Sequence, residues 1–240
     1  MDTLDEKIIC YLNQFAHKSS ALDNLINFIS YQHFLKSGIL VMLLWWFWFQ
    51  FKEEELNVAN REHILATITC CLMAIFLGRI LALTLPFRLR PMHNPTLFFQ
   101  LPYGSRESIL EGWSSFPSDH ACLFFSLATG LFFISRLIGI LALLHALLVI
   151  SLFRVYLGLH YPSDIMVGGA IGIIIALLGN QTKIKIFISR PLMKWLRAHP
   201  SSFYVCFFVL SYQIVNLFNG FREMATTLFK LIKWLPNFLQ

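Results

Sequence analysis

IGILALLHALLVISLFRVYLGLHYPSDIMVGGAIGIIIALLG, residues 138–179, holds two apolar runs separated by a short polar turn at 157–162. Each run approaches the roughly 20 apolar residues that cross the hydrocarbon core of a bilayer. A helix satisfies its own backbone hydrogen bonds in lipid, so each run is predicted to be a membrane helix. The stretch therefore predicts a helical hairpin whose turn lies at one membrane surface.

The rest of the chain extends the same pattern. The other apolar runs cover residues 35–51, 64–86, 118–135 and 201–219. The 240 residues are 57% hydrophobic and 13% charged, with a mean hydropathy of +0.63. A soluble domain usually carries about 25% charged residues, which argues against the soluble and disordered classes. We predict an all-α fold, a polytopic transmembrane bundle of about six spans.

Polar residues divide the chain into three regions. Residues 1–34 are predicted to form one or two interfacial amphipathic helices, with Lys18 and Asp23 facing water. Residues 35–219 form the predicted transmembrane domain, and residues 220–240 a basic amphipathic tail. The N-terminus carries acidic residues where a signal peptide has basic ones, so the internal spans are expected to target the chain.

Part of the net charge of +6 indicates how the chain is oriented in the membrane. The segment 180–200 carries five cations and no acidic residue, namely Lys183, Lys185, Arg190, Lys194 and Arg197. The positive-inside rule places this segment in the cytoplasm. The loop 87–117 and the turn 157–162 then face the periplasm of a bacterial inner membrane. The tryptophans Trp45, Trp46 and Trp48 are predicted to mark a membrane interface.

Three polar clusters meet at that outer face: PFRLRP at 86–91, FPSDHA at 116–121 and RVYLGLHYPSD at 154–164. Arginine is costly in a membrane helix unless it is paired or functional, and its forked donors match phosphate oxygens. Pro117 is expected in the first turn of a helix, whose N-terminus would attract an anion. The three clusters together predict an anion site.

Two histidines, His120 and His160, fall within these clusters. Asp164 follows His160 by four residues, so its carboxylate is expected to hydrogen-bond the His160 ring. Such a bond would fix the tautomer and leave the other ring nitrogen free to attack.

The clusters resemble the motifs of the type 2 phosphatidic acid phosphatases, relatives of bacterial acid phosphatases and vanadium haloperoxidases. The family pattern Pro-Ser-x-His matches residues 117–120. The pattern Ser-Arg-x5-His-x3-Asp matches Arg154, His160 and Asp164, although Phe153 replaces the serine.

The remaining family pattern, Lys-x6-Arg-Pro, is only half present. Arg90 and Pro91 match it, but Leu83 stands where the lysine belongs. Arg79 is the nearest cation upstream, and it would have to reach the site from one turn further back.

The resemblance implies an acid phosphatase/haloperoxidase-like core that needs neither metal nor cofactor. It implies that His160 is the nucleophile, Asp164 orients it, and His120 protonates the leaving oxygen and then activates water. It also implies a set of phosphate-binding candidates, which are Arg90, Arg154, Ser118, Arg79 and Arg88. The site also lacks the clustered carboxylates that would bind Mg²⁺.

The sequence therefore predicts an integral membrane phosphatase. Its substrate would be a lipid phosphate or diphosphate, such as undecaprenyl pyrophosphate, phosphatidic acid, phosphatidylglycerol phosphate or lipid A phosphate. The alternatives are a phosphotransferase that uses the same phosphohistidine, and a non-hydrolytic lipid-phosphate binder or transporter. The expected partners are the lipid substrate and the bilayer, with no nucleic acid; the sequence specifies no oligomeric state.

Three further interpretations concern residues outside the motifs. The aromatic loop 92–117, with Phe98 and Phe99, is either a surface hairpin on the headgroups or a lid over the site. His145 is expected to be a satisfied residue within a helix. The five cysteines are interpreted as small buried hydrophobic residues.

Overall fold

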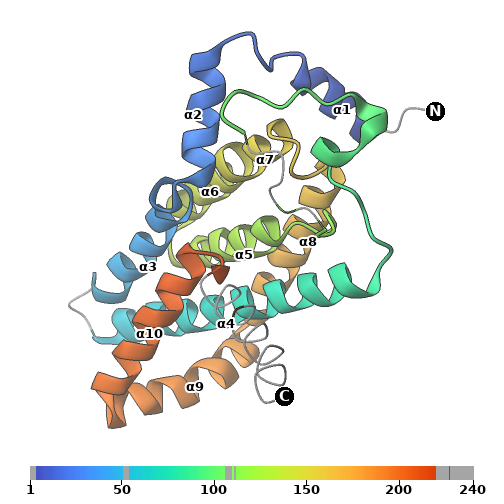
Figure 1. Ribbon diagram of the computed structural model, residues 1–240. Helices are drawn as coiled ribbons and strands as arrows, with labels where there is room; N and C mark the ends of the chain where they lie inside the picture. The colour runs from blue at the N-terminus through green and yellow to red at the C-terminus, as the bar shows by residue number, and fades with distance from the viewer. Residues whose placement is uncertain (1–3, 51–53, 106–109, 111, 220–226, 228–240) are drawn as a thin grey trace, which may run out of the picture.

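A computed structural model describes residues 4–50, 54–105, 110, 112–219 and 227 (Figure 1). Within these residues all regular structure is helical, which confirms the all-α prediction. The elements are α1 (Leu4–Asn13), α2 (Ser20–Tyr31), η1 (Phe34–Gly38), α3 (Ile39–Phe49), α4 (Glu54–Thr84), η2 (Pro91–His93), η3 (Pro95–Leu97), α5 (Asp119–Ile134), α6 (Arg136–His145), η4 (Ala146–Ser151), α7 (Leu152–Tyr156), α8 (Pro162–Gly179), α9 (Thr182–Ala198) and α10 (Pro200–Val215).

Helix α5 is the centre of the bundle, and α4, α6 and α8 pack around it (Figure 1). Most of its side chains are buried. Glycine permits the close contact with α8: a Cβ at Gly172 would lie 2.4 Å from the carbonyl oxygen of Cys122, and one at Gly168 2.7 Å from that of Ser118. Small residues spaced by four in this way are typical of tightly packed membrane helices.

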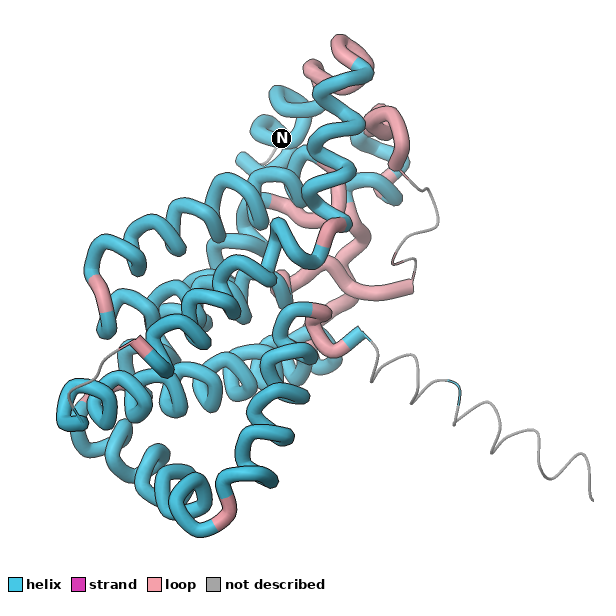
Figure 2. The backbone as a smooth tube through the Cα atoms, turned by 90° about the vertical axis from the view of Figure 1, so that its left-hand side faces the viewer, coloured by secondary structure: helices cyan, strands magenta, loops and turns pink. Residues whose placement is uncertain are grey.

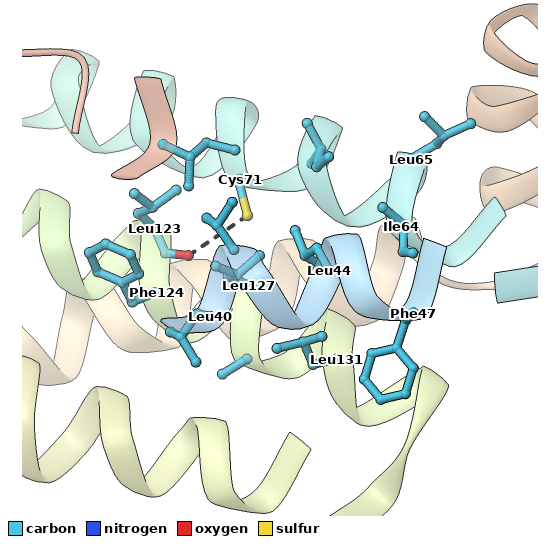
Figure 3. Close-up of a cluster of buried hydrophobic side chains, with 14 of the residues drawn as sticks. Leu40, Leu44, Phe47, Ile64, Leu65, Cys71, Leu123, Phe124, Leu127 and Leu131 are labelled. Carbon is cyan, nitrogen blue, oxygen red and sulfur yellow. Dashed lines mark hydrogen bonds between the residues drawn. The ribbon is translucent and has the colours of Figure 1, made fainter. Parts of the chain in front are cut away.

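The main apolar core lies beside α5, where α3 and α4 meet it (Figure 3). Leu40 and Leu44 of α3 pack with Leu123 and Leu127 of α5, and all four are almost fully buried. Cys71 of α4 donates to the carbonyl of Leu123 across 3.8 Å. This packing holds α5 at a fixed position, and with it the Pro-Ser-x-His residues 117–120 at its start.

Within the part of the chain that the structure describes, three helices are long and apolar enough to cross a membrane, namely Leu56–Thr84, Arg136–Tyr156 and Pro162–Gly179. Three shorter apolar helices, Phe34–Phe49, Asp119–Ile134 and Pro200–Val215, occupy the other predicted runs. The central α5 has 16 residues. Since neighbouring helices cover it, its length is not set by the lipid.

Two polar segments between the predicted apolar runs are helical. The charged stretch 52–63, between the runs 35–51 and 64–86, is mostly the first part of α4, which begins at Glu54. Arg61 donates from Nε to the carbonyl of Trp48 across 3.2 Å, which shows how a charged residue is accommodated there. The basic segment 180–200 is largely α9, an amphipathic helix.

The N-terminal region forms α1 and α2 as expected, but the prediction that Asp23 faces water is wrong. Asp23 is fully buried and accepts hydrogen bonds from the hydroxyl of Tyr156 and the backbone N–H groups of His17 and Tyr103. Lys18 is exposed. In Figure 2 most of the loop segments, drawn in pink, lie towards the end of the bundle that holds the N-terminus. Most of the predicted tail 220–240 lies outside the described residues.

The tryptophan and cysteine interpretations hold only in part. Trp46 is exposed, but Trp48 is buried in the core and donates to the hydroxyl of Tyr204 across 3.2 Å. Cys70, Cys71 and Cys122 are buried, whereas Cys10 and Cys206 are exposed.

Candidate active site

A cavity of about 370 Å³ opens where the three polar clusters converge. Arg90 represents the first cluster in its wall, His120 the second, and Arg154 and His160 the third. The predicted convergence of distant motifs on one site is therefore what the fold produces. Arg79 of α4 lines the same cavity.

His160 lies in the turn between α7 and α8, and it is almost fully buried. Its Nδ1 is 2.8 Å from the carbonyl oxygen of Ser115, and its Nε2 is 3.5 Å from Nη1 of Arg90. A carbonyl only accepts and a guanidinium only donates. These partners therefore place the proton on Nδ1 and leave a lone pair on Nε2.

Burial lowers the pKa of His160 to about 4, helped by the positive charges of Arg90 and Arg154 and opposed by Asp164. The ring is therefore neutral at neutral pH. A neutral imidazole with a free Nε2 is the form that can attack phosphorus.

Asp164 supports this turn in a different way from the predicted one. Its Oδ2 is 3.6 Å from Nδ1 of His160, close enough for an ion pair with a protonated ring, but the hydrogen bond goes to Ser115. Oδ2 accepts from the backbone N–H of Tyr161 at 2.8 Å, and Oδ1 accepts from Arg88 at 2.6 Å. Asp164 thus braces the backbone that carries His160. No sequence signal marks the carbonyl of Ser115, because any residue supplies one.

His120 stands in the first turn of α5, where its Nε2 accepts from Nη2 of Arg154 across 2.6 Å. Arg154 is buried near the end of α7, and its Nε has no hydrogen-bond partner among the described residues. A buried donor without a partner is costly. The pairing brings one cation and one titratable ring together at the cavity wall.

Arg90 is held beside His160 by backbone carbonyls. Nη1 donates to Leu159 at 2.6 Å and Nη2 to Ser114 at 3.2 Å, while Nε has no partner among the described residues. Burial lowers its pKa to about 10, so the side chain remains a cation at neutral pH. Its orientation is fixed before any phosphate arrives.

Arg79 reaches the cavity, as the missing motif lysine had suggested. It forms an ion pair with Asp119, and its guanidinium lies 5.0 Å from the ring centroid of Trp113. Leu83, at the lysine position of the family pattern, is 85% exposed and does not line this cavity. A cation at position 83 would therefore point elsewhere in this chain.

Ser118 does not line the cavity. It is fully buried and caps α5, where its Oγ accepts from the N–H of Ala121 at 3.5 Å. Its own N–H donates to the carbonyl of Asp164 at 3.2 Å. Pro117 precedes α5 instead of starting it, and it lines the cavity. Ser118 therefore fixes the helix start that presents His120.

Arg88 also lies outside the cavity wall. Nη1 donates to Ser163 at 2.8 Å and to Asp164 at 2.6 Å, and Nη2 donates to Asp5 at 2.7 Å. The guanidinium lies 4.0 Å from the ring centroid of Tyr161. These contacts brace the turn that carries His160, and the predicted contact of Arg88 with phosphate stays a prediction.

We expect Arg88→Met to impair stability more than chemistry. It leaves two carboxylates, Asp5 and the buried Asp164, without their cation, at a cost on the order of 2 kcal/mol. The midpoint of thermal unfolding in detergent should fall relative to an Arg136→Met control. A loss of kcat/KM above a hundred-fold at unchanged stability would instead indicate a direct phosphate contact.

Lys36 of η1 and Trp113 of the long loop are among the cavity residues that sequence reasoning missed. Lys36 was identifiable as a lone cation near the start of an apolar run, where charge is costly. Trp113 carried no comparable signal. His145 is satisfied as expected, since its Nε2 is 3.0 Å from the carbonyl oxygen of Lys36.

The two halves of the loop 92–117 have different surroundings, and its two predicted roles stay predictions. The first half is anchored on α1 and on the link to α2, where Gln100 and Leu101 bond to Asn13 and His17. Phe98 is exposed away from the cavity. Leu110, Trp113 and Ser114 of the second half form part of the cavity wall. Residues 106–109 and 111, including Arg106, Glu107, Ile109 and Glu111, lie outside the described residues.

Comparison with known proteins gives concordant results. Residues 63–187 match the model of the PAP2 superfamily. The bacitracin transport permease protein BcrC of Bacillus licheniformis is 28% identical over 178 residues, which cover 73% of this chain and 79% of that protein. Undecaprenyl-diphosphatase BcrC of Bacillus subtilis (strain 168) is 23% identical over 175 residues, which cover 73% and 82% of the two chains. No solved structure matches significantly.

The matched region spans more than half of the chain and contains every residue of the three motifs. The apolar helices and the bacterial relatives identify a multi-pass membrane protein of bacteria. The protein is accordingly a member of the PAP2 superfamily, as the motifs had suggested.

Proposed function

We propose that this protein hydrolyses a polyprenyl diphosphate, undecaprenyl diphosphate in the first instance, through a phosphohistidine on His160. Membership of the PAP2 superfamily and the name of the Bacillus subtilis relative support a phosphatase acting on a lipid phosphate. The observation that carries the mechanism is the His160 ring, whose Nδ1 is bound by Ser115 and whose Nε2 faces Arg90.

The first chemical step is attack of His160 Nε2 on the terminal phosphorus. The bond from phosphorus to the bridging oxygen breaks, and protonated His120 delivers a proton to that oxygen. A phosphoryl oxygen would compete with His120 for the Nη2 donor of Arg154, which releases Nε2 of His120 for proton transfer. In the second step neutral His120 takes a proton from water, the water oxygen attacks phosphorus, and His160 leaves.

The charge of the cavity suits a polyanionic headgroup. Among the described residues of its wall are four cationic side chains, those of Lys36, Arg79, Arg90 and Arg154, and one carboxylate, that of Asp119, which is paired with Arg79. Phosphoryl transfer depends on positioning and on stabilising charge spread over the phosphoryl oxygens. A diphosphate places several such oxygens within reach of this ring of cations.

A second cavity supports a lipid tail. It measures about 580 Å³ and shares Arg79, Ala82, Trp113 and Ser114 with the charged cavity. The rest of its wall is apolar and comprises Ile75, Leu83, Leu85, Phe87, Gly112 and Phe218. A headgroup among the cations would therefore lie next to an apolar path along α4.

We further propose that the site faces the periplasm. The cations of α9 favour the cytoplasm by the positive-inside rule, and α9 lies at the end of the bundle opposite to α1 and α2. Cysteine-specific labelling of intact cells tests this orientation. In a cysteine-free background, a single cysteine is introduced at the exposed position of Lys7 or at that of Lys183, and the labelling of the two proteins is compared. Labelling of position 183 alone would overturn it.

The proposed activity is tested by phosphate release from a panel of lipids by the purified protein with a chelator present. Undecaprenyl diphosphate should give the highest kcat/KM, ahead of undecaprenyl phosphate and phosphatidic acid. Activity that requires an added divalent cation would contradict the metal-independent mechanism. No phosphate release from any lipid would refute the phosphatase.

Trp113 offers a test of the lipid path. Trp113→Ala should lower kcat/KM for a long-chain diphosphate about ten-fold more than for a water-soluble short-chain diphosphate, because Trp113 lines both cavities. Phe98→Ala is the matched aromatic control, since Phe98 lies in the same loop and lines neither of these cavities. Equal losses on both substrates would show that Trp113 acts only through Arg79.

A further inference from the structure

Lys36 lies at the charged cavity although no family motif includes it. It belongs to the π-helical turn η1, which leads into α3. The side chain lines the same cavity as His120, Arg154 and His160. The residue as a whole is 5% exposed, so its ammonium group is presented from within the protein body and not from a solvated surface.

The turn that carries Lys36 is firmly held. The carbonyl of Lys36 lies 3.0 Å from Nε2 of His145, in the helix that follows α5. The hydroxyl of the next residue, Ser37, donates to the carbonyls of His33 at 2.8 Å and Val215 at 2.7 Å. Contacts to two distant helices therefore fix the direction in which η1 presents its side chains. A π turn is frequently retained at functional sites.

Lys36 has no ion-pair partner among the described residues. Its ammonium shares the cavity wall with the positive side chain of Arg154. Two like charges in a poorly solvated cavity destabilise the fold. Their retention is explained if an anion bridges them during function.

We propose that Lys36 is a further phosphate-binding residue of the charged cavity. Leu83 is 85% exposed and outside the charged cavity, so a lysine there would not reach the headgroup. Lys36 approaches the cavity from η1 instead of from α4. The inference rests on the proposed function for its substrate, a lipid diphosphate, but its phosphate contact can be measured without turnover.

The kinetic test compares Lys36→Met with Lys36→Arg and with Lys7→Met. Lys7 is an exposed lysine of α1 that does not line the cavity. Lys36→Met should lower kcat/KM for the lipid diphosphate at least ten-fold and weaken inhibition by inorganic phosphate by a similar factor, since a charge-assisted hydrogen bond is lost. Lys36→Arg should restore part of both. Lys7→Met should match the wild type.

A binding test separates this inference from the proposed function. Inorganic pyrophosphate should raise the unfolding temperature of the full-length wild type in detergent, and Lys36→Met should lose most of that increase while its own unfolding temperature without pyrophosphate stays equal or rises. A wild type that binds pyrophosphate but releases no phosphate from lipids would refute the proposed function and leave Lys36 as a phosphate ligand. The inference would be overturned if pyrophosphate raised the unfolding temperature of both proteins equally, or did not raise that of the wild type. An unchanged kcat/KM in Lys36→Met would overturn it as well.

Discussion

His160→Gln and His160→Ala should each lower phosphate release from the lipid diphosphate by on the order of 10⁴-fold or more, because removal of the nucleophile leaves no path to a covalent intermediate. Glutamine can keep a donor for the carbonyl of Ser115, which holds the wild-type ring at 2.8 Å. The variant should therefore retain binding of inorganic pyrophosphate. Wild type quenched in alkaline detergent should contain a phosphoryl group that is stable to base and labile to acid, and the variant should not.

Stability against pH gives an independent control for the His160 variants. The pKa of histidine in an unfolded chain is about 6.5, whereas burial lowers the pKa of His160 in the folded protein to about 4. The unfolded state therefore takes up the proton first, and the wild type loses stability as the pH falls from 6.5 towards 4. His160→Gln should lose less stability across this window. Full phosphatase activity in either variant would disprove the assignment of the nucleophile.

His120→Gln should slow the first chemical step by about 10²–10⁴-fold, the range usual for loss of a general acid. The loss should depend on the leaving group. With 4-nitrophenyl phosphate, whose phenolate leaves without a proton, the burst of product should be affected much less than with phenyl phosphate. The phosphohistidine should then accumulate, since no base activates water to remove it.

A matched variant makes the His120 result specific. Phe124→Leu lies one turn further along α5, and the ring of Phe124 lies 6.1 Å from that of His120. It should keep the same dependence on leaving group as the wild type. Equal burst losses for both phenyl esters in His120→Gln would show that His120 only positions Arg154.

The bundle could be predicted because lipid imposes strong rules on sequence. A run such as 162–179 has to be a helix, and its bounds coincide with those of α8. The start of α4 could not be placed, because charged residues such as Arg61 are compatible with both a turn and a helix end. The burial of Asp23 was also hidden, since its partners Tyr103 and Tyr156 lie far away in sequence.

The candidate site, like the fold, could be predicted from the sequence only in part. His120, Arg154 and His160 were identified because their types and spacing match a chemical task, and the fold brings them to one cavity. The capping contact of Ser118 and the bracing contacts of Arg88 could not be predicted, since a cap or a brace uses the same residue types as a phosphate ligand. Ser115 contributes through its backbone, and Lys36 comes from an unrelated turn, so no spacing rule could connect either one to the site.

The contacts of Asp5 bear on how this protein is prepared for experiments. Asp5 of α1 accepts from Arg88 and from both the N–H and the hydroxyl of Ser163, next to the turn that holds His160. Removing the first helix would therefore remove contacts that support this turn. Affinity tags and fusion partners are therefore better joined at the other end of the chain.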